Sequence, residues 1–225
     1  VDNAMALISS KIPALSNAQI ESALIKSMKT LAADGITSVH DAGVGKDVIE
    51  AYKRINQNNA MPIRINAMLA AASPSAEHYL DSGIVRSDNS MFQLNSVKIS
   101  SDGALGSRGA AMIMPYSDQP EHKGLLLHRE DKLKGLMQAA MEKGFQVNTH
   151  AIGDYANKIV LDLYEILIKK TDTKSLRHRV EHAQILQLED IPRFKKLNVI
   201  ASMQSTHATS DKNMAEDRVG SNRIL

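Results

Sequence analysis

The chain has 225 residues, 43% hydrophobic and 23% charged, so it can bury the core of one large α/β domain or two small ones. Its 27 basic and 25 acidic residues leave a net charge of +2, and only 4% of the residues are aromatic. This argues against a nucleic-acid partner, which would need a basic stripe interleaved with stacking aromatics. No apolar run approaches the ~18 residues of a membrane-spanning helix, and no signal peptide is evident. We therefore expect no membrane partner and a cytoplasmic location, with a secreted or periplasmic one left open.

The sequence contains no cysteine. Disulfides, thiolate metal sites and cysteine nucleophiles are therefore excluded. Any metal site in this chain must use nitrogen and oxygen ligands, such as histidine and carboxylate side chains.

The first half of the chain alternates between helical and extended patterns. Residues 1–15 give no clear prediction. Gln19 stands three residues after Ser16, which is the pattern of a capping box, and predicts a helix that ends at Gly35. The segments that follow are predicted, in order, as a strand at 36–40, a helix at 47–58, a strand at 63–69, a short helix from Ser73 to Gly83 and a strand at 92–99.

Residues 102–129 form a long stretch rich in Gly, Pro, Ser and Asp. Loops of this length inside a compact domain are usually either functional or disordered. Because this stretch follows a strand that carries Lys98, we expect it to cover the carboxyl ends of the strands. Its segment 115–123 is predicted to be mobile.

The second half continues the alternation. The predicted elements are a helix at 130–143, a strand at 145–150, a helix capped by Asp154, a strand at 177–183, a helix at 188–196 and a strand at 199–203. The polar stretch from Gln204 onward is assigned no element. Six strands alternating with helices indicate a parallel sheet, and a (β/α) barrel is the favoured arrangement. Nucleotide binding is disfavoured, because neither a Gly-x-Gly-x-x-Gly turn nor a Walker-type loop is present.

Two histidines, His150 and His182, stand at the ends of successive predicted strands, a little more than one β/α repeat apart. In parallel barrels the loops at the carboxyl ends of the strands build the active site, so these imidazoles are placed to share a metal ion. Lys98 stands at the end of the preceding strand. A lysine is protonated at neutral pH and binds metal poorly, but carboxylation by CO₂ would turn it into an oxygen ligand. Such a site would activate water and polarise a carbonyl.

Plainer interpretations of these residues stay open. A histidine at a strand end is more often a hydrogen-bonded core or surface residue, and a lone lysine is more often ion-paired. A metal-free lyase or isomerase with Lys98 as a Schiff base is another alternative, although it gives the two histidines no role. The histidines in helix or loop contexts are expected to be solvated: His78, His122, His128 and His178.

Several segments resemble signature blocks of the YtcJ-like branch of the metal-dependent amidohydrolase superfamily, and they occur in the same order as there. The blocks are VKISSDGALGSRGAA at 97–111, NTHAIGD at 148–154, RHRVEHAQ at 177–184 and ASMQSTHATSD at 201–211. The segment GITSVHDAG at 35–43 fits an earlier strand of the same family. The resemblance extends from residue 16 to residue 221.

The resemblance implies a TIM-type (β/α) barrel that hydrolyses C–N bonds other than peptide bonds, with N-substituted formamide and related amide hydrolases as nearest models. The partner would be a small-molecule amide substrate, and the cofactor one or two divalent ions, expected to be zinc. Lys98 corresponds to the family's carboxylated bridging lysine, and His150 and His182 to the metal-binding histidines of strands five and six. These three are the catalytic and metal-binding candidates. Four further residues are implied in substrate binding: Asp102, Arg108, Gln204 and His207.

The sequence also departs from the family pattern. It lacks the His-x-His pair of the first strand, the aspartate of the eighth strand and the small β-sandwich. We therefore expect residues 1–225 to form a single partial barrel domain, with strands two to seven of the eight, that holds at most one ion. The alternative is a catalytically inactive truncated barrel, either a binding or regulatory protein or a gene fragment. Open barrel edges would favour self-association.

Overall fold

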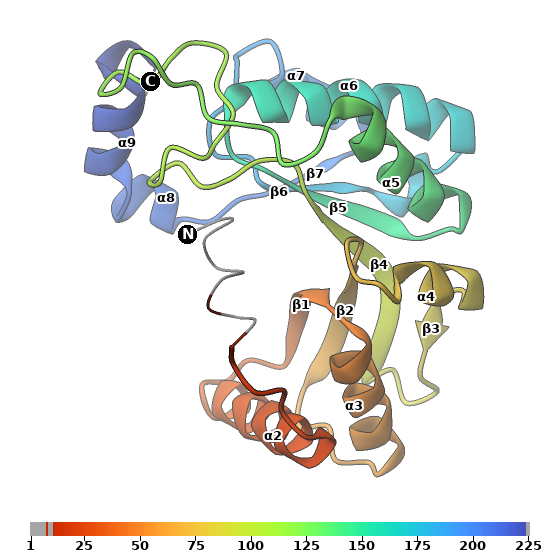
Figure 1. The fold of residues 1–225 in the computed structure, drawn as a ribbon. Helices are drawn as coiled ribbons and strands as arrows, with labels where there is room; N and C mark the ends of the chain where they lie inside the picture. Colours follow the sequence, from red (N-terminus) through yellow and green to blue (C-terminus); the bar gives the residue numbers. More distant parts are fainter. Residues whose placement is uncertain (1–7, 9–10, 224–225) are drawn as a thin grey trace. The chain divides into compact units, whose positions relative to one another are not determined.

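The computed structural model describes residue 8 and residues 11–223 of the chain (Figure 1). The chain divides into two compact units, residues 1–98 with 143–145 and residues 99–142 with 146–225. The single domain that we predicted over residues 1–225 stays a prediction. Within the described part of the chain, no helix is long and apolar enough to cross a membrane.

The first unit is built on three parallel strands, β1 (Ser38–Val44), β2 (Arg64–Ala70) and β4 (Phe92–Ser100), of which β4 contributes its residues up to Lys98. β2 lies between β1 and β4, and the short strand β3 (Val85–Arg86) pairs with β4 in antiparallel fashion. The helices of this unit are α2 (Asn17–Ala33), α3 (Lys46–Gln57) and α4 (Ala76–Ser82). α2 and α3 pack side by side (Figure 1).

Local sequence explains both the start of α2 and the burial of β2. The Ser16 hydroxyl accepts a hydrogen bond from the N–H of Gln19 at 3.3 Å, and the Gln19 side chain accepts one from the N–H of Ser16 at 2.9 Å. The predicted capping box is therefore confirmed. Residues 67–69 of β2 are all fully buried. Such a continuous apolar run is typical of a parallel strand that is covered on both faces.

The second unit is built on β5 (Gln146–Ala151), β6 (Arg179–His182) and β7 (Ile200–Ser202), which pair in parallel in that order. Helices α5 (Glu130–Glu142), α6 (Asp154–Thr171) and α7 (Ile191–Leu197) alternate with these strands as predicted, and the 3-10 turn η2 (Lys174–Leu176) precedes β6. After β7 come α8 (Thr206–Thr209), α9 (Lys212–Val219) and η3 (Ser221–Arg223). The sequence prediction assigned no element to this last stretch and missed all three.

Tyr164 of α6 contacts both β5 and β6 through its hydroxyl group. Its side chain is fully buried, and its hydroxyl lies 3.0 Å from the carbonyl oxygen of Val147 and 2.8 Å from that of Arg179. One hydroxyl thus contacts both strands and supports the register in which β5 and β6 pair. In that register Ala151 lies opposite His182, which brings the ends of the two strands to the same level.

The prediction that Asp154 caps α6 was wrong. Gly153 occupies the cap position, and Asp154 is the first helical residue. Its buried carboxylate accepts hydrogen bonds from the N–H of Ile113 at 2.8 Å and of Tyr155 at 2.9 Å. Asp154 therefore ties the long loop 102–129 to the start of α6.

The prediction that His178 is solvated was also wrong. Its side chain is 0% exposed and stacks on the ring of Tyr164. Its Nδ1 accepts a hydrogen bond from the N–H of Val147 at 2.9 Å, and its Nε2 lies 3.0 Å from the hydroxyl of Thr173. Burial lowers the pKa of His178 to about 4, so the ring is neutral at physiological pH. Among the other histidines of this group, His78 is exposed, and His122 and His128 are half-buried.

Candidate metal centre

His150 and His182 lie next to each other at the carboxyl ends of β5 and β6, as the strand pattern predicted. Their ring centroids are 4.5 Å apart and the ring planes meet at 73°, so one ring presents its edge to the face of the other. The His150 side chain is 16% exposed. Two imidazoles this close are within reach of one ion, and a shared ion stays a prediction.

β6 ends in a backbone turn that presents His182 at the strand end. The φ angles of His182 and Ala183 are 77° and 45°, both in the left-handed region that non-glycine residues rarely adopt. The N–H of Ala183 donates to the carbonyl oxygen of Ala151 at 3.1 Å, which holds this turn against the end of β5. Backbone conformations of this kind cost free energy and are concentrated at functional sites.

Each of the two rings has one nitrogen next to an oxygen acceptor. Nδ1 of His182 lies 2.8 Å from the side-chain oxygen of Gln204, so this nitrogen donates and carries the proton. Nε2 of His150 lies 3.3 Å from a carboxylate oxygen of Asp102 and 3.5 Å from the carbonyl oxygen of Gly103. With its proton on Nδ1, His182 has its lone pair on Nε2.

This donor set fits a divalent ion with imidazole ligands. Metal-binding histidines usually donate their other N–H to an oxygen acceptor, and an oxygen acceptor lies next to one nitrogen of each ring. Within the described residues, no group of three or more His, Cys, Asp or Glu side chains is arranged to hold one ion. The pair therefore supplies two ligand positions, whereas a closed zinc site requires four.

Lys98 belongs to the first unit, where it lies near the end of β4. Its backbone pairs with Ala70 of β2, and its carbonyl oxygen accepts a hydrogen bond from Ala71 at 3.0 Å. The stem of its side chain passes Gly43 at the end of β1, where a Cβ atom would lie 3.8 Å from the Lys98 Cγ. Carboxylation of Lys98 and its part in metal binding stay predictions.

Asp102 and Arg108 both lie in the long loop, and each has a protein partner. The Asp102 side chain is buried and accepts hydrogen bonds from three backbone N–H groups. Arg108 is paired with Asp118 through two hydrogen bonds of 3.1 and 2.8 Å, and it holds the pKa of that carboxyl below its usual range. Their predicted contact with substrate stays a prediction.

The long loop packs on the carboxyl end of β5 and the start of α6, as predicted. The carbonyl oxygen of Ala111 accepts a hydrogen bond from the N–H of Tyr155 at 3.1 Å. A Cβ atom on Gly153 would lie 2.0 Å from that same oxygen, so only glycine fits at this crossing. The backbone of the loop at Ala111 therefore packs directly against the backbone between β5 and α6 at Gly153.

The segment 115–123, predicted to be mobile, is held by specific contacts. Tyr116 is buried, its hydroxyl donates to the carbonyl oxygen of Ala110 at 2.7 Å, and its N–H donates to that of His122 at 2.9 Å. Arg218 of α9 donates to the carbonyl oxygen of Gly106 at 3.2 and 3.1 Å and pairs with Asp118. Sequence reasoning missed Arg218, because no element was assigned to that stretch.

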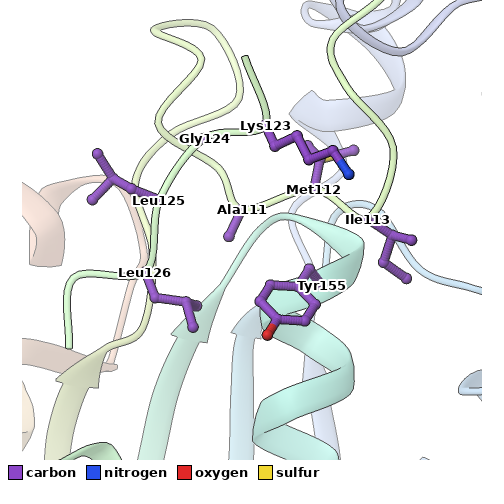
Figure 2. Close-up of a pocket in the computed structure, with 8 residues that line it drawn as sticks. All are labelled: Ala111, Met112, Ile113, Lys123, Gly124, Leu125, Leu126 and Tyr155. Atoms are coloured by element: carbon purple, nitrogen blue, oxygen red, sulfur yellow. The ribbon is translucent and has the colours of Figure 1, made fainter. Parts of the chain in front are cut away.

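Two pockets of about 450 Å³ lie in the second unit. One lies between the long loop and α6, with Ala111, Leu126 and Tyr155 in its wall (Figure 2), and neither candidate histidine lines it. The other is lined by Gln204 and His207. Gln204 contacts His182 directly, and the ring of His207 lies 6.1 Å from that of His182 by centroid. The second pocket therefore adjoins the candidate metal centre.

The alternating β/α order and the parallel strands define a partial TIM-type barrel, the fold of solved metal-dependent hydrolases. An uncharacterized metal-dependent hydrolase from Pyrococcus horikoshii has the same fold, with a TM-score of 0.80 at 26% identity over 93% of this chain and 41% of that one. An uncharacterized metal-dependent hydrolase from Pyrococcus furiosus gives a TM-score of 0.82 at 26% identity, over 97% of this chain and 44% of that one. The predicted fold class is thereby confirmed.

Residues 1–225 match the model of the amidohydrolase family, and the chain belongs to that family. It is 32% identical to the protein LONG AFTER FAR-RED 3 of Arabidopsis thaliana, over 100% of this chain and 40% of that protein. It is 31% identical to YtcJ of Bacillus subtilis (strain 168), an amidohydrolase by name, over 99% of this chain and 42% of that protein. The chain thus spans about two-fifths of the length of these relatives. The predicted YtcJ-like family is confirmed.

Proposed function

We propose that this chain contributes the imidazole half of the metal centre of a hydrolase for C–N bonds other than peptide bonds. The substrate would be a small amide or formamide, and the ion zinc. The observation that carries the proposal is the pair His150 and His182, with ring centroids 4.5 Å apart and one nitrogen of each ring next to an oxygen acceptor. Membership of the amidohydrolase family supports the reaction class.

In this proposal, His150 and His182 hold the ion through Nδ1 and Nε2, respectively. A divalent ion bound there supplies water of lowered pKa and polarises the amide carbonyl. The chain itself keeps the rings in place: Gln204 accepts the Nδ1 proton of His182. The pocket lined by Gln204 and His207 would hold the substrate beside the rings, with Ile185 and Met203 as an apolar wall.

Zinc titration of the purified 225-residue chain tests the metal site. We expect binding that is lost in both His150→Ala and His182→Ala and unchanged in His78→Ala, because His78 is exposed and belongs to the first unit. Zinc binding that survives both substitutions would contradict the proposal. Turnover is assayed with the zinc-loaded chain as formate or amine release from N-substituted formamides and simple amides, and release that requires His150 supports the hydrolase.

A second candidate is a catalytically inactive barrel that acts as a binding or regulatory protein. The observation that favours it is that, within the described residues, no third His, Cys, Asp or Glu is arranged to hold one ion together with the two imidazoles. Two ligands hold zinc weakly, and a hydrolase also needs a group that passes a proton to the leaving amine. This candidate predicts weak zinc binding and no product from any substrate of the panel.

A further inference from the structure

We propose that Asp102 is a positioning residue that fixes the His150 ring with its proton on Nε2, instead of the substrate contact that the sequence suggested. The preference for this tautomer follows from the surroundings of the ring alone. Its consequence for metal binding rests on the function proposed above. The two parts are therefore tested by separate measurements.

The carboxylate of Asp102 is enclosed by the protein. The residue is 1% exposed. One oxygen, Oδ1, accepts a hydrogen bond from the N–H of Ile152 at 3.0 Å. The other, Oδ2, accepts from the N–H groups of Ala111 and Gly153, both at 2.9 Å. Three donors from two different segments fix the orientation of the carboxylate.

The same carboxylate faces the ring of His150. Nε2 of His150 lies 3.3 Å from Oδ1 of Asp102 and 3.5 Å from the carbonyl oxygen of Gly103. A carboxylate and a carbonyl oxygen can only accept hydrogen bonds. An imidazole nitrogen between two acceptors is stabilised in its protonated form, so Nδ1 is left with the lone pair that a metal ion requires.

The residue before Asp102 holds the backbone of His150. The carbonyl oxygen of His150 accepts a hydrogen bond from the N–H of Ser101 at 3.0 Å and another from the Ser101 hydroxyl at 2.5 Å. Three consecutive residues, 101–103, therefore contact His150 at both its backbone and its ring. Gly103 packs closely against Gly109: its N–H donates to the Gly109 carbonyl oxygen at 3.1 Å, and a Cβ atom on Gly103 would lie 3.0 Å from the Gly109 Cα.

A purely structural role for Asp102, as an anchor of the loop, would leave the tautomer of His150 unspecified. The two roles are distinguished by ¹⁵N NMR of the imidazole nitrogens in the metal-free 225-residue chain labelled at histidine. If the proposal is right, His150 shows a protonated Nε2 and an unprotonated Nδ1. A protonated Nδ1 in the wild-type chain would overturn the proposal, whatever the variants do.

The variant Asp102→Asn replaces one acceptor oxygen with an N–H donor. Its oxygen is expected to keep the bonds from Ala111 and Gly153, which directs its amide nitrogen toward His150 and moves the ring proton to Nδ1. The matched control is Asp118→Asn, a change of the same kind in the same loop, whose carboxylate contacts Arg108 and Arg218. We expect the control to leave the His150 tautomer unchanged. A folded Asp102→Asn chain with Nε2 still protonated would refute the positioning role.

Zinc affinity gives the second measurement. Loss of a group that orients a metal ligand typically weakens binding by about 10- to 100-fold, and we expect this for Asp102→Asn and no change for Asp118→Asn. If the wild-type chain binds no zinc, the proposed function fails while the tautomer result stands by itself. If the wild-type chain binds zinc and a folded Asp102→Asn chain binds it equally well, the positioning role fails and the proposed function stands.

Discussion

The side-chain oxygen of Gln204 lies 2.8 Å from Nδ1 of His182 and so orients the ring whose other nitrogen, Nε2, we propose as a metal ligand. Sequence reasoning placed Gln204 among the substrate-binding residues, and that role stays a prediction. The contact with His182 is present without a bound substrate, so Gln204 orients this ring independently of substrate binding.

This contact predicts the effect of Gln204 on zinc binding. Gln204→Ala removes the acceptor and is expected to weaken zinc binding by about 10-fold, whereas Gln204→Glu keeps an acceptor and retains the affinity. The control is Gln138→Ala, because Gln138 lies on α5 and its side chain bonds to Glu142. Titration against a chromophoric chelator measures the affinities. Equal affinities for Gln204→Ala and wild type would show that the contact does not orient the ring.

The burial of His178 predicts a loss of stability in acid. The folded-state pKa of about 4 lies below the value of about 6.5 for an unfolded chain. The unfolded state therefore binds the extra proton first, and stability falls as the pH drops from about 6.5 to about 4, by roughly 3 kcal/mol in total. Urea unfolding at a series of pH values measures this slope.

His178→Asn removes the titrating group and should flatten that slope, although it also lowers stability at neutral pH. His78→Asn is the control, because His78 is exposed, and it should keep the wild-type slope. If His178→Asn loses stability in acid as steeply as the wild type, then other groups cause the acid sensitivity.

Two glycine-to-alanine substitutions should change stability in opposite directions. In Gly153→Ala the new Cβ would lie 2.0 Å from the carbonyl oxygen of Ala111, which is backbone and cannot rotate away. We expect a loss of about 3 kcal/mol or more, because overpacking forces the backbone to shift. In Gly135→Ala, inside α5, the Cβ meets nothing within 4 Å, and a gain of about 0.5–1 kcal/mol is expected from helix propensity. Urea unfolding measures the stability of both variants. A Gly153→Ala chain as stable as the wild type would show that the backbones at Gly153 and Ala111 are not tightly packed.

Arg218 is predicted to hold the long loop in its observed conformation. Arg218→Ala removes the hydrogen bonds to Gly106 and the ion pair with Asp118, so amide hydrogen exchange in residues 106–118 should accelerate. Lys212→Ala, on the same helix and exposed, is the control and should leave the exchange rates unchanged. Unchanged protection of 106–118 in Arg218→Ala would mean that Tyr116 and its apolar neighbours hold the segment without the arginine.

Carboxylation of Lys98 is tested most directly by isotope labelling. With ¹³C-bicarbonate and zinc present, we expect one carbamate carbon signal in the wild-type chain and none in Lys98→Arg. The control is Lys26→Arg, on the exposed side of α2, which should keep the signal. A signal that persists in Lys98→Arg would assign the carbamate to another lysine.

The elements that sequence predicted correctly depend on local patterns. The capping box at Ser16 needs four neighbouring residues, and the pairing of His150 with His182 needs only two strands of similar length in successive β/α repeats. α9 was missed because its apolar residues are few: only Met214, Ala215 and Val219 stand among polar residues. Their packing against the long loop supplies the stabilisation that local propensity lacks.

The environments of individual polar residues could not be predicted, because the partners are distant in sequence. Asp102 is held by N–H groups of residues 152 and 153, and the ring of His178 by the N–H of Val147. A sequence places an aspartate in a loop, but only the folded chain shows whether the carboxylate faces a pocket or a set of backbone donors.

The contact between Arg218 and Gly106 joins residues 112 positions apart. The apolar cluster beneath the loop, with Met112 and Tyr116, is completed by Ala215 and Val219 of α9. During synthesis the loop therefore leaves the ribosome long before the helix that covers it, and its apolar side chains stay open to chaperones and to other chains until α9 follows. A ribosome that stalls between residues 130 and 210 should thus carry a nascent chain with enhanced chaperone binding at the loop, and release of the remaining residues should end it.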